Sequence, residues 1–494
     1  MAGSPTPLRP LWHAPPDGAL LSYDAFSLER HIPEGSRSGD TRREFARDRD
    51  RVLYSSAFRR LAGKTQVVAS DEYGLYHTRL THSLKVAQLG RRAAERLREE
   101  YENARKTPRK DREIAPPDPD LVEVACLSHD IGHPPFGHIG EETLCHTFDR
   151  LALAADAAAP PYDTPLDKIP SPAAEQLSVA RRGGFEGNAQ TFRVLDYLAT
   201  RLPGFHDTGL NLTNATLDAA TKYPWLRVTG KTIRNKWGAI AFDAERLKEI
   251  RGAAGVRWKA PKSFEAQLMD WCDDVTYAVH DVVDFYRSGF IPLHRLFALA
   301  GGPKRRSLSE EGEAFLKAFL DANPGVGRTS ARQAWIAIAE LSDFNTAWEP
   351  TNKIKAATQA ATSEMITYFL DGLSFEGEPC RHNGTLLKDK DKAKARQKEL
   401  AVEILKYMLR FFVIEGPKLR TLQHGQALIV QTLLEIYAND PEMLPADRDE
   451  EFGRHGDALR AATDFVASLT EPDAQALYRR LTGHRFGALT DAVV

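Results

Sequence analysis

The stretch Leu127-Ser128-His129-Asp130-Ile131-Gly132-His133-Pro134-Pro135-Phe136-Gly137-His138-Ile139-Gly140-Glu141 decides how this chain folds. An apolar run at helical spacing leads into it, so we expect His129 and Asp130 to end a buried helix. Gly132 is expected to stop that helix, and Pro134-Pro135 forbid its continuation. Burial of adjacent ligand-type side chains at a helix end raises the free energy of the folded protein unless these side chains bind a ligand. The stretch therefore predicts a metal site.

The composition of the chain limits the class of protein to which it can belong. The chain has 494 residues, of which 42% are hydrophobic and 27% charged, as in an ordinary soluble globular protein of two or three domains. Its net charge of −2 argues against a wholesale polyanion binder. The four cysteines form no C-x-x-C pair and are expected to be reduced thiols. No signal segment or membrane-spanning run is evident, so we expect a cytoplasmic protein with no membrane partner.

Local composition divides the chain into three parts. Residues 1–40, rich in Pro, Gly and Ser, are expected to form a loose N-terminal arm. Residues 41–292 are expected to form the main folded core, with a flexible Ala- and Pro-rich insertion at about 152–184, and residues 293–494 a C-terminal helical region. Strand alternation is strong nowhere, so the predicted fold is all-α. Beyond the core, helical periodicity marks residues 310–322, 330–347, 353–372, 397–413 and 420–438.

Upstream of the opening stretch, His77-Thr78-Arg79-Leu80-Thr81-His82-Ser83 begins a predicted helix that runs through Arg98. A lone histidine at a helix start is usually structural, so His82 becomes a ligand candidate only with other support. The preceding arginine-rich segment, with Arg59, Arg60 and Lys64, is either a solvated helix face or a source of phosphate contacts.

The clearest long helix is predicted at residues 264–286. One stripe of this helix is apolar, and a second carries carboxylates around one aromatic ring. Like charges at this spacing cost a few tenths of a kcal/mol per pair, which a solvated face tolerates. The aromatic ring between two aspartates favours a functional face. The residues of this second stripe are Asp270, Asp273, Tyr277, Asp281 and Asp284.

The histidine-containing segments and the predicted helix at 264–286 together supply a set of metal ligands. His82, His129 and Asp130, with one aspartate of the second stripe, give two imidazoles and two carboxylates. Such mixed ligands suit Mg²⁺, Mn²⁺, Zn²⁺ or iron, and open positions on the ion would suit a phosphate ester.

Four strings in this order carry a more specific resemblance: H-T-R-L-T-H-S, H-D-I-G-H-P-P-F-G-H-I-G-E, F-E-G-N-A-Q and D-D-V-T-Y-A-V-H-D. They resemble the bacterial dGTP triphosphohydrolases of the HD superfamily of metal-dependent phosphohydrolases. The resemblance runs from about Arg42 to Pro292 and is thin beyond it, so it implies that residues 41–292 are the catalytic core. It implies an HD-domain helical bundle with additional C-terminal helices. It also implies metal-dependent hydrolysis of dGTP or several dNTPs to the deoxynucleoside and inorganic triphosphate.

The resemblance implies that the metal ligands are His82, His129, Asp130 and either Asp273 or Asp274. Helical geometry favours Asp273, because Asp273, Tyr277 and Asp281 share a face. Asp274 is expected about 100° away, on the side of the apolar stripe. The family pattern also places a tyrosine four residues, and an aspartate eight residues, after the ligand.

The remaining roles also follow from the resemblance. His138 and Glu141 match the catalytic His-acid pair, and the residues leave open which of them is the base. His133 is either a catalytic helper or a histidine that braces its loop. Four residues would hold triphosphate or sugar: Arg79, Lys222, Tyr223 and Lys236.

Two residues of the long helix match the sugar site. Tyr277 against C2′ would exclude a 2′-hydroxyl, and Asp281 would accept a hydrogen bond from the 3′-hydroxyl. As alternatives, Tyr277 is a core tyrosine, and Asn188 and Gln190 are cap and packing residues.

Two other functions remain open from the sequence. An HD-type nucleotide phosphomonoesterase or phosphodiesterase would share the metal ligands, but would not use Arg79, Lys222, Tyr277 and Asp281. A nucleic-acid-binding regulatory protein with a non-catalytic pocket would not need intact ligands. The resemblance also implies a homo-oligomer, a tetramer or hexamer, with a dNTP effector and single-stranded DNA as further partners.

Overall fold

The structure is a computed structural model. It describes residues 26–34, 39–66, 78–105, 116–156, 183–201, 208–229, 232–252, 261–301, 306–341, 344, 346–376, 385–446 and 457–484. Most of the predicted N-terminal arm, His77 and the bulk of the predicted insertion lie outside the described residues.

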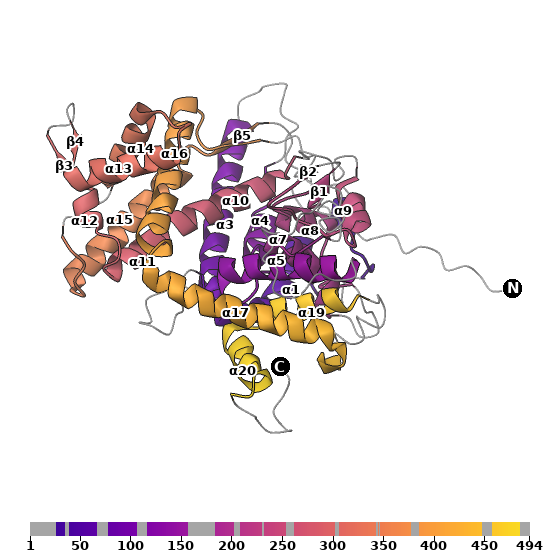
Figure 1. The fold of residues 1–494 in the computed structure, drawn as a ribbon. Helices are drawn as coiled ribbons and strands as arrows, with labels where there is room; N and C mark the ends of the chain where they lie inside the picture. The colour runs from indigo at the N-terminus through magenta and orange to yellow at the C-terminus, as the bar shows by residue number, and fades with distance from the viewer. Residues whose placement is uncertain are drawn as a thin grey trace.

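Helices make up most of the described part of the chain, which confirms the predicted all-α class (Figure 1). Those of the expected catalytic core are α1 (Glu44–Tyr54), α2 (Ser56–Arg60), α3 (Arg79–Arg105), α4 (Pro119–Ser128), α5 (Gly137–Asp156), α7 (Gly187–Arg193), α8 (Asn214–Ala220), α9 (Ala244–Arg251), α10 (Phe264–Thr276) and α11 (Val282–Arg287). Those of the C-terminal region are α12 (Leu293–Leu296), α13 (Glu310–Ala322), α14 (Arg328–Leu341), α15 (Asn352–Leu370), α16 (Lys392–Leu409), α17 (Pro417–Asn439), α19 (Ala458–Ser468) and α20 (Glu471–Leu481).

Shorter elements connect these helices. Three π-helical turns are η5 (Val194–Leu198), η7 (Tyr277–Asp281) and η9 (Arg410–Ile414), and three 3₁₀ turns are η1 (Phe26–Leu28), η2 (Leu61–Gly63) and η10 (Pro441–Met443). Antiparallel hairpins join β1 (Val228–Thr229) to β2 (Thr232–Ile233), β3 (Leu299–Ala300) to β4 (Ser307–Leu308), and β5 (Ser374–Glu376) to β6 (Thr385–Leu387). Among the described helices, none combines the length and the apolar character that crossing a membrane requires.

Helix α4 is the interior helix that the apolar run predicts. It begins at the N-cap Asp118, whose side chain accepts from the amide of Asp120, and Pro119 occupies its first turn. Every residue of α4 except Asp120 and Glu123 is buried, and α3, α1, α8 and α10 surround it. The helix ends at Ser128, so His129 and Asp130 follow directly on its buried end.

Gly132 has a different role from the one expected. The helix has already ended at Ser128 when the chain reaches Gly132. A Cβ at Gly132 would lie 2.1 Å from the amide nitrogen of Thr191, and the Gly132 amide donates to the Thr191 hydroxyl at 3.0 Å. The glycine is therefore required for close packing against α7 rather than for stopping a helix.

The hydrophobic core crosses the expected boundary at residue 292. One continuous cluster of buried side chains includes α1, α3, α4 and α10, and extends through α13 to α16. A second cluster joins α5 to α17, α19 and α20, and Figure 1 shows α17 running beside α5. The C-terminal helices therefore pack directly on the helix that follows the His-Asp motif.

The predicted helix at 264–286 contains a π turn, η7, between α10 and α11. In an uninterrupted α-helix, eight residues rotate about 80° beyond two full turns. The wider π turn rotates less per residue, which brings Asp281 back toward the face of Asp273. Helical periodicity alone does not reveal such a turn.

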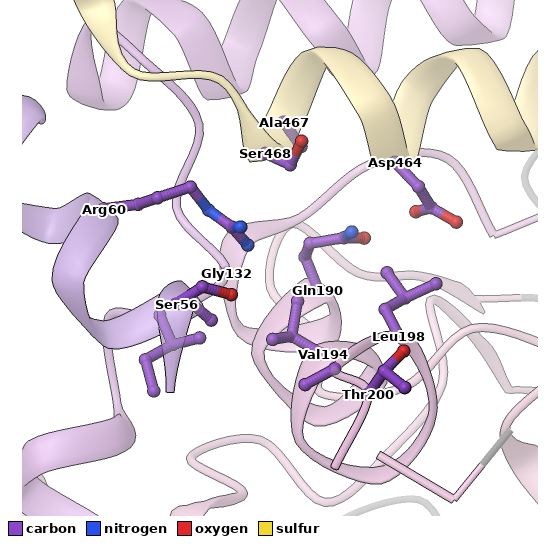
Figure 2. Close-up of a pocket in the computed structure, with 13 residues that line it drawn as sticks. Ser56, Arg60, Gly132, Gln190, Val194, Leu198, Thr200, Asp464, Ala467 and Ser468 are labelled. Carbon is purple, nitrogen blue, oxygen red and sulfur yellow. The ribbon is translucent and has the colours of Figure 1, made fainter. Parts of the chain in front are cut away.

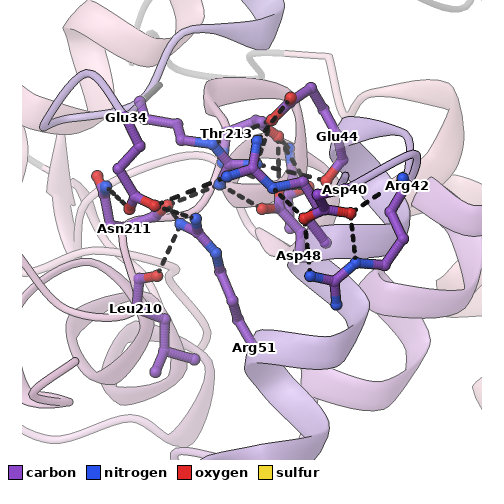
Figure 3. A network of polar contacts seen from close by, with 12 residues as sticks. Glu34, Asp40, Arg42, Glu44, Asp48, Arg51, Leu210, Asn211 and Thr213 are labelled. Carbon is purple, nitrogen blue, oxygen red and sulfur yellow. Dashed lines mark hydrogen bonds and ion pairs between the residues drawn. The ribbon is translucent and has the colours of Figure 1, made fainter. Parts of the chain in front are cut away.

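The segment before α1 is fixed to the core by the buried carboxylate of Asp48 (Figure 3). Asp48 pairs with Arg30 at 2.5 Å and accepts hydrogen bonds from the Thr213 amide, at 3.0 Å, and the Thr216 hydroxyl, at 2.7 Å. Nearby, the Asn211 side chain pairs with the backbone of Ile32 through two hydrogen bonds of 2.9 Å. This network joins residues 26–34 to α1 and to the start of α8.

We predict that Asp48→Ala lowers the free energy of unfolding by about 3 kcal/mol, because it removes a buried carboxylate that pairs with Arg30 and accepts hydrogen bonds from Thr213 and Thr216. The measurement is the midpoint of thermal unfolding. Asp50→Ala is the control, because Asp50 pairs with the half-exposed Arg42 and should leave the midpoint nearly unchanged. Equal shifts for the two variants would contradict the assigned role of Asp48.

Candidate functional site

Three helices bring the predicted metal ligands together. His82 comes from the first turns of α3, His129 and Asp130 follow α4, and Asp273 comes from α10. Ligand atoms of His82, His129 and Asp130 lie within 4.8 Å of one another. Asp273 Oδ1 lies 3.0 Å from His82 Nε2 and 3.6 Å from His129 Nε2. Their roles as ligands stay a prediction, but the four side chains share one buried site.

The ring of His129 is oriented as a metal ligand requires. Its Nδ1 lies 2.7 Å from the carbonyl oxygen of Cys126, which fixes the proton of the neutral ring at Nδ1. The lone pair of Nε2 then faces Asp130 and Asp273, and Nε2 is buried without a hydrogen-bond partner among the described residues. An orphaned imidazole nitrogen between two carboxylates fits a divalent cation.

The pKa values of His129 and His82 are consistent with a cation at this site. Burial opposes protonation of His129, but Asp130 and Asp273 outweigh it and raise its pKa to about 9. In the metal-free protein, a proton therefore supplies the positive charge that the carboxylates favour. Burial lowers the pKa of His82, which keeps that ring neutral and available as a ligand.

The structure separates Asp273 from Asp274. Asp273 faces the two histidines, whereas Asp274 pairs with Lys406 of α16 at 2.5 Å. The Asp274 side chain is about one-third exposed (35%). The carboxylate of Asp274 is directed away from the histidines.

Two cations neutralise the carboxylates of the site. Lys222 Nζ lies 2.8 Å from both Asp273 Oδ2 and Asp270 Oδ1, and Arg79 donates to Asp130 Oδ2 at 2.6 Å. The Nε of Arg79 is buried and has no hydrogen-bond partner in the described part of the chain. Arg79 and Lys222 thus lie directly beside the predicted ligands. Sequence patterns did not reveal that Asp270 pairs with Lys222.

Tyr277 and Asp281 follow Asp273 along the same helical segment. Tyr277 is partly buried, and burial together with Asp281 and Asp273 raises its pKa. Asp281 is buried, and its Oδ2 has no hydrogen-bond partner among the described residues. Burial and the neighbouring Asp284 raise the pKa of Asp281 well above its ordinary value. A protonated carboxyl group here can both donate and accept a hydrogen bond.

His133 lies next to the ligands rather than among them. Its Nδ1 lies 3.1 Å from Asp130 Oδ1 without hydrogen-bond geometry, and the ring is buried. Burial and the charge of Arg79 lower its pKa to about 3, so the ring is neutral at neutral pH. A Cβ on Gly187 would meet this ring at 3.1 Å, so His133 also braces the contact between its loop and α7.

The first turn of α5 carries His138 and Glu141 at i and i+3. His138 is 70% exposed and its Nδ1 lies 3.5 Å from Glu141 Oε2. Glu141 is buried and accepts from the Gly187 amide at 2.8 Å and from Lys236 Nζ at 2.9 Å. Burial opposes its ionisation, but the hydrogen bond with His138 and nearby charges hold its pKa well below the usual range.

Lys236 also contacts Glu186, a residue that the sequence analysis did not single out. Lys236 Nζ lies 3.2 Å from Glu186 Oε1, and burial and Glu141 raise the pKa of Glu186 to about 7. Asn188 donates to Glu186 at 2.8 Å, so Asn188 belongs to the cap of α7. Tyr223 lies close enough to this group that the charges of Glu186 and Lys236 affect its pKa. Its ring is 5.6 Å from that of Trp225, and Lys262 Nζ lies over it at 5.0 Å.

The upstream basic residues are distributed over different surroundings. Arg59 is exposed, whereas Lys64 is buried and donates to the carbonyl oxygens of His133, at 2.6 Å, and Ala467, at 2.8 Å. Arg60 and Gln190 line a cavity of about 170 Å³ beside Gly132. Figure 2 shows them converging there with Asp464 of α19. None of the predicted metal ligands lines this cavity.

Family models match two parts of the chain. The model of the HD domain matches residues 79–164, and the model of the phosphohydrolase-associated domain matches residues 394–480. The first match contains His82, His129, Asp130, His138 and Glu141. The second extends the likeness into the C-terminal region, where the sequence analysis found it thin.

Relatives that match over most of their length indicate the same family. The chain is 34% identical to the deoxyguanosinetriphosphate triphosphohydrolase-like protein of Streptomyces coelicolor, over 94% of this chain and 98% of the relative. It is 33% identical to the protein of the same description from Corynebacterium glutamicum (strain R), over 92% and 96%, and 32% identical to that from Bifidobacterium longum, over 92% and 86%. Their similarity spans nearly the whole chain, so this protein belongs to the family of deoxyguanosinetriphosphate triphosphohydrolase-like proteins, HD-domain phosphohydrolases.

Proposed function

We propose that this protein hydrolyses deoxynucleoside triphosphates, dGTP or several dNTPs, to the deoxynucleoside and inorganic triphosphate. The observation that carries the proposal is the convergence at Asp273: two histidines face one of its oxygens, and Lys222 faces the other. Tyr277 and Asp281 continue from Asp273 along the same helical segment. A metal ligand that also pairs with a phosphate-binding cation would thus be followed by a sugar-selecting pair along the α10–η7 segment.

A divalent ion held by His82, His129, Asp130 and Asp273 would supply Lewis-acid polarisation of the α-phosphate and a water of lowered pKa. Either Mg²⁺ or Mn²⁺ suits this mixed set of ligands, and so do Zn²⁺ and iron.

Lys222 and Arg79 bind the triphosphate in this proposal. In the structure, each neutralises a carboxylate of the predicted metal site. A bound cation would take over that neutralisation, which frees both side chains to contact phosphate oxygens through charge-assisted hydrogen bonds. Lys236 and Tyr223 extend the same binding surface.

Glu141 and His138 carry out proton transfer in this proposal. The low pKa of Glu141 keeps it a carboxylate at neutral pH, where it orients the His138 ring. The exposed imidazole can exchange a proton with water and with the 5′ oxygen of the leaving deoxynucleoside.

Tyr277 and Asp281 select the sugar. The Tyr277 ring against C2′ leaves no room for a 2′-hydroxyl, and the buried carboxyl of Asp281 forms a hydrogen bond with the 3′-hydroxyl. Because Asp281 Oδ2 has no partner among the described residues, a 3′-hydroxyl would satisfy it without displacing another contact.

The test of the reaction is product identification after incubation of the protein with Mn²⁺ or Mg²⁺ and each dNTP. We expect deoxynucleoside and inorganic triphosphate, because attack at the α-phosphorus releases the whole triphosphate. Pyrophosphate, inorganic phosphate or a nucleoside monophosphate would instead indicate a phosphomonoesterase or phosphodiesterase. An absence of turnover would favour a regulatory protein with a non-catalytic pocket.

We predict that Asp273→Ala weakens Mn²⁺ binding by at least about 100-fold in calorimetric titrations, because it removes a direct ligand. Asp274→Ala is the matched neighbour and should retain affinity within a few-fold, because Asp274 pairs with Lys406. The reverse ranking would show that the ligand had been misassigned.

For the sugar site, Tyr277→Ala should narrow the ratio of dGTP to GTP turnover by about tenfold or more, because it removes the steric wall. Tyr277→Phe keeps the ring and should keep the ratio. If Tyr277→Ala leaves the kcat/KM ratio unchanged, the ring does not exclude ribonucleotides.

A further inference from the structure

We propose that Glu471, the first residue of α20, is a positioning residue that fixes the turn between the metal ligands and the His138–Glu141 pair. The inference rests on the proposed function, because it assigns this pair a part in the reaction. It gives the C-terminal helices a direct role in shaping the catalytic motif.

Glu471 joins two segments of the catalytic core through its two carboxylate oxygens. Oε1 accepts from the amide of Phe136 at 3.1 Å and from the amide of Thr65 at 2.7 Å. Oε2 accepts from the Thr65 hydroxyl at 2.5 Å. Glu471 is buried, so these hydrogen bonds are shielded from water.

The amide that Glu471 holds belongs to a strained residue. Phe136 has a φ of 67°, and among the described residues only Asn211 shares a positive φ without being glycine. An aromatic residue in the left-handed region is sterically unfavourable and persists only where its surroundings fix it. The hydrogen bond from the Phe136 amide to Glu471 is one such constraint.

Lys64 fixes the same junction from the other side of the turn. It donates to the carbonyl of His133, which enters the turn, and to the carbonyl of Ala467 in α19. Next to it, a Cβ on Gly63 would lie only 2.8 Å from Thr470 Cβ, so the segments are in close contact. Three parts of the chain therefore meet here: residues 63–65, the motif turn and the α19–α20 connection.

The turn determines where the first turn of α5 begins. Gly137 follows Phe136 with a φ of 60° and is the first residue of α5, and a Cβ on Gly140 would lie 2.0 Å from the Pro135 carbonyl oxygen. His138 and Glu141 therefore inherit their position from this turn. His129 and Asp130 precede the turn in the sequence, and His82 and Asp273 come from the separate helices α3 and α10. Loss of Glu471 should thus affect catalysis without removing the metal site.

The same helix turn contains a matched control. Asp473 lies two residues after Glu471 and forms a capping box with Thr470, with its amide donating to the Thr470 hydroxyl at 3.3 Å. Among the described residues, Asp473 has no hydrogen bond or ion pair with the motif turn. Removing it weakens the start of α20 without removing a hydrogen bond to Phe136.

The test compares Glu471→Ala, Glu471→Gln and Asp473→Ala in the full chain. We expect Glu471→Ala to lower kcat at least tenfold, with KM and Mn²⁺ affinity changed less than threefold. Glu471→Gln should lower kcat less, because an amide oxygen can still accept from Phe136. Asp473→Ala should lower the midpoint of thermal unfolding but keep kcat within twofold.

Hydrogen exchange supplies a readout that does not depend on turnover. Amides of residues 133–141 should exchange at least tenfold faster in Glu471→Ala and at the wild-type rate in Asp473→Ala. Equal exchange in the two variants, or an unchanged kcat in Glu471→Ala, would overturn the positioning role. If the wild-type protein releases other products, the proposed function fails, whereas hydrogen exchange still decides the role of Glu471.

Discussion

The contact of Asp273 with His82 and His129 is the interaction on which the rest of the structure depends. It requires α3, α10 and the residues after α4 to bring polar side chains within 3.0–3.6 Å of one another, where both histidines are buried and Asp273 is partly buried. Burial of ionised carboxylates is unfavourable unless opposite charge accompanies them. Lys222 and Arg79 supply that charge in the protein alone, and a metal ion would supply it in the proposed enzyme. The apolar faces of α3, α4 and α10 hold this arrangement in place.

Sequence periodicity predicted the elements that approach the site but not all of their contacts. The helical repeat favoured Asp273 over Asp274, and the structure places Asp273 on the histidines. The repeat could not reveal the π turn at Tyr277–Asp281, because one wider turn leaves the apolar pattern nearly intact. It also could not reveal the partner of Asp274, since the pairing with Lys406 depends on a helix more than a hundred residues away.

The Glu471 contact illustrates the limit of local patterns most clearly. Phe136 and Glu471 are 335 residues apart, and no periodicity in either segment indicates that they meet. Sequence patterns in the C-terminal helices therefore do not connect them to the site. The second hydrophobic cluster, which joins α5 to α17, α19 and α20, brings them to the motif. Long-range packing, and not a local sequence pattern, connects the phosphohydrolase-associated domain to the turn at Phe136.

The proposed function depends on one metal site formed by the side chains of His82, His129, Asp130 and Asp273. The most direct measurement is anomalous diffraction at the manganese absorption edge from crystals grown with Mn²⁺. We predict one strong anomalous peak bounded by Nε2 of His82 and His129 and by the carboxylates of Asp130 and Asp273. Absence of density there, or a peak within the neighbouring acidic group of Asp270, Asp273 and Asp274, would contradict it.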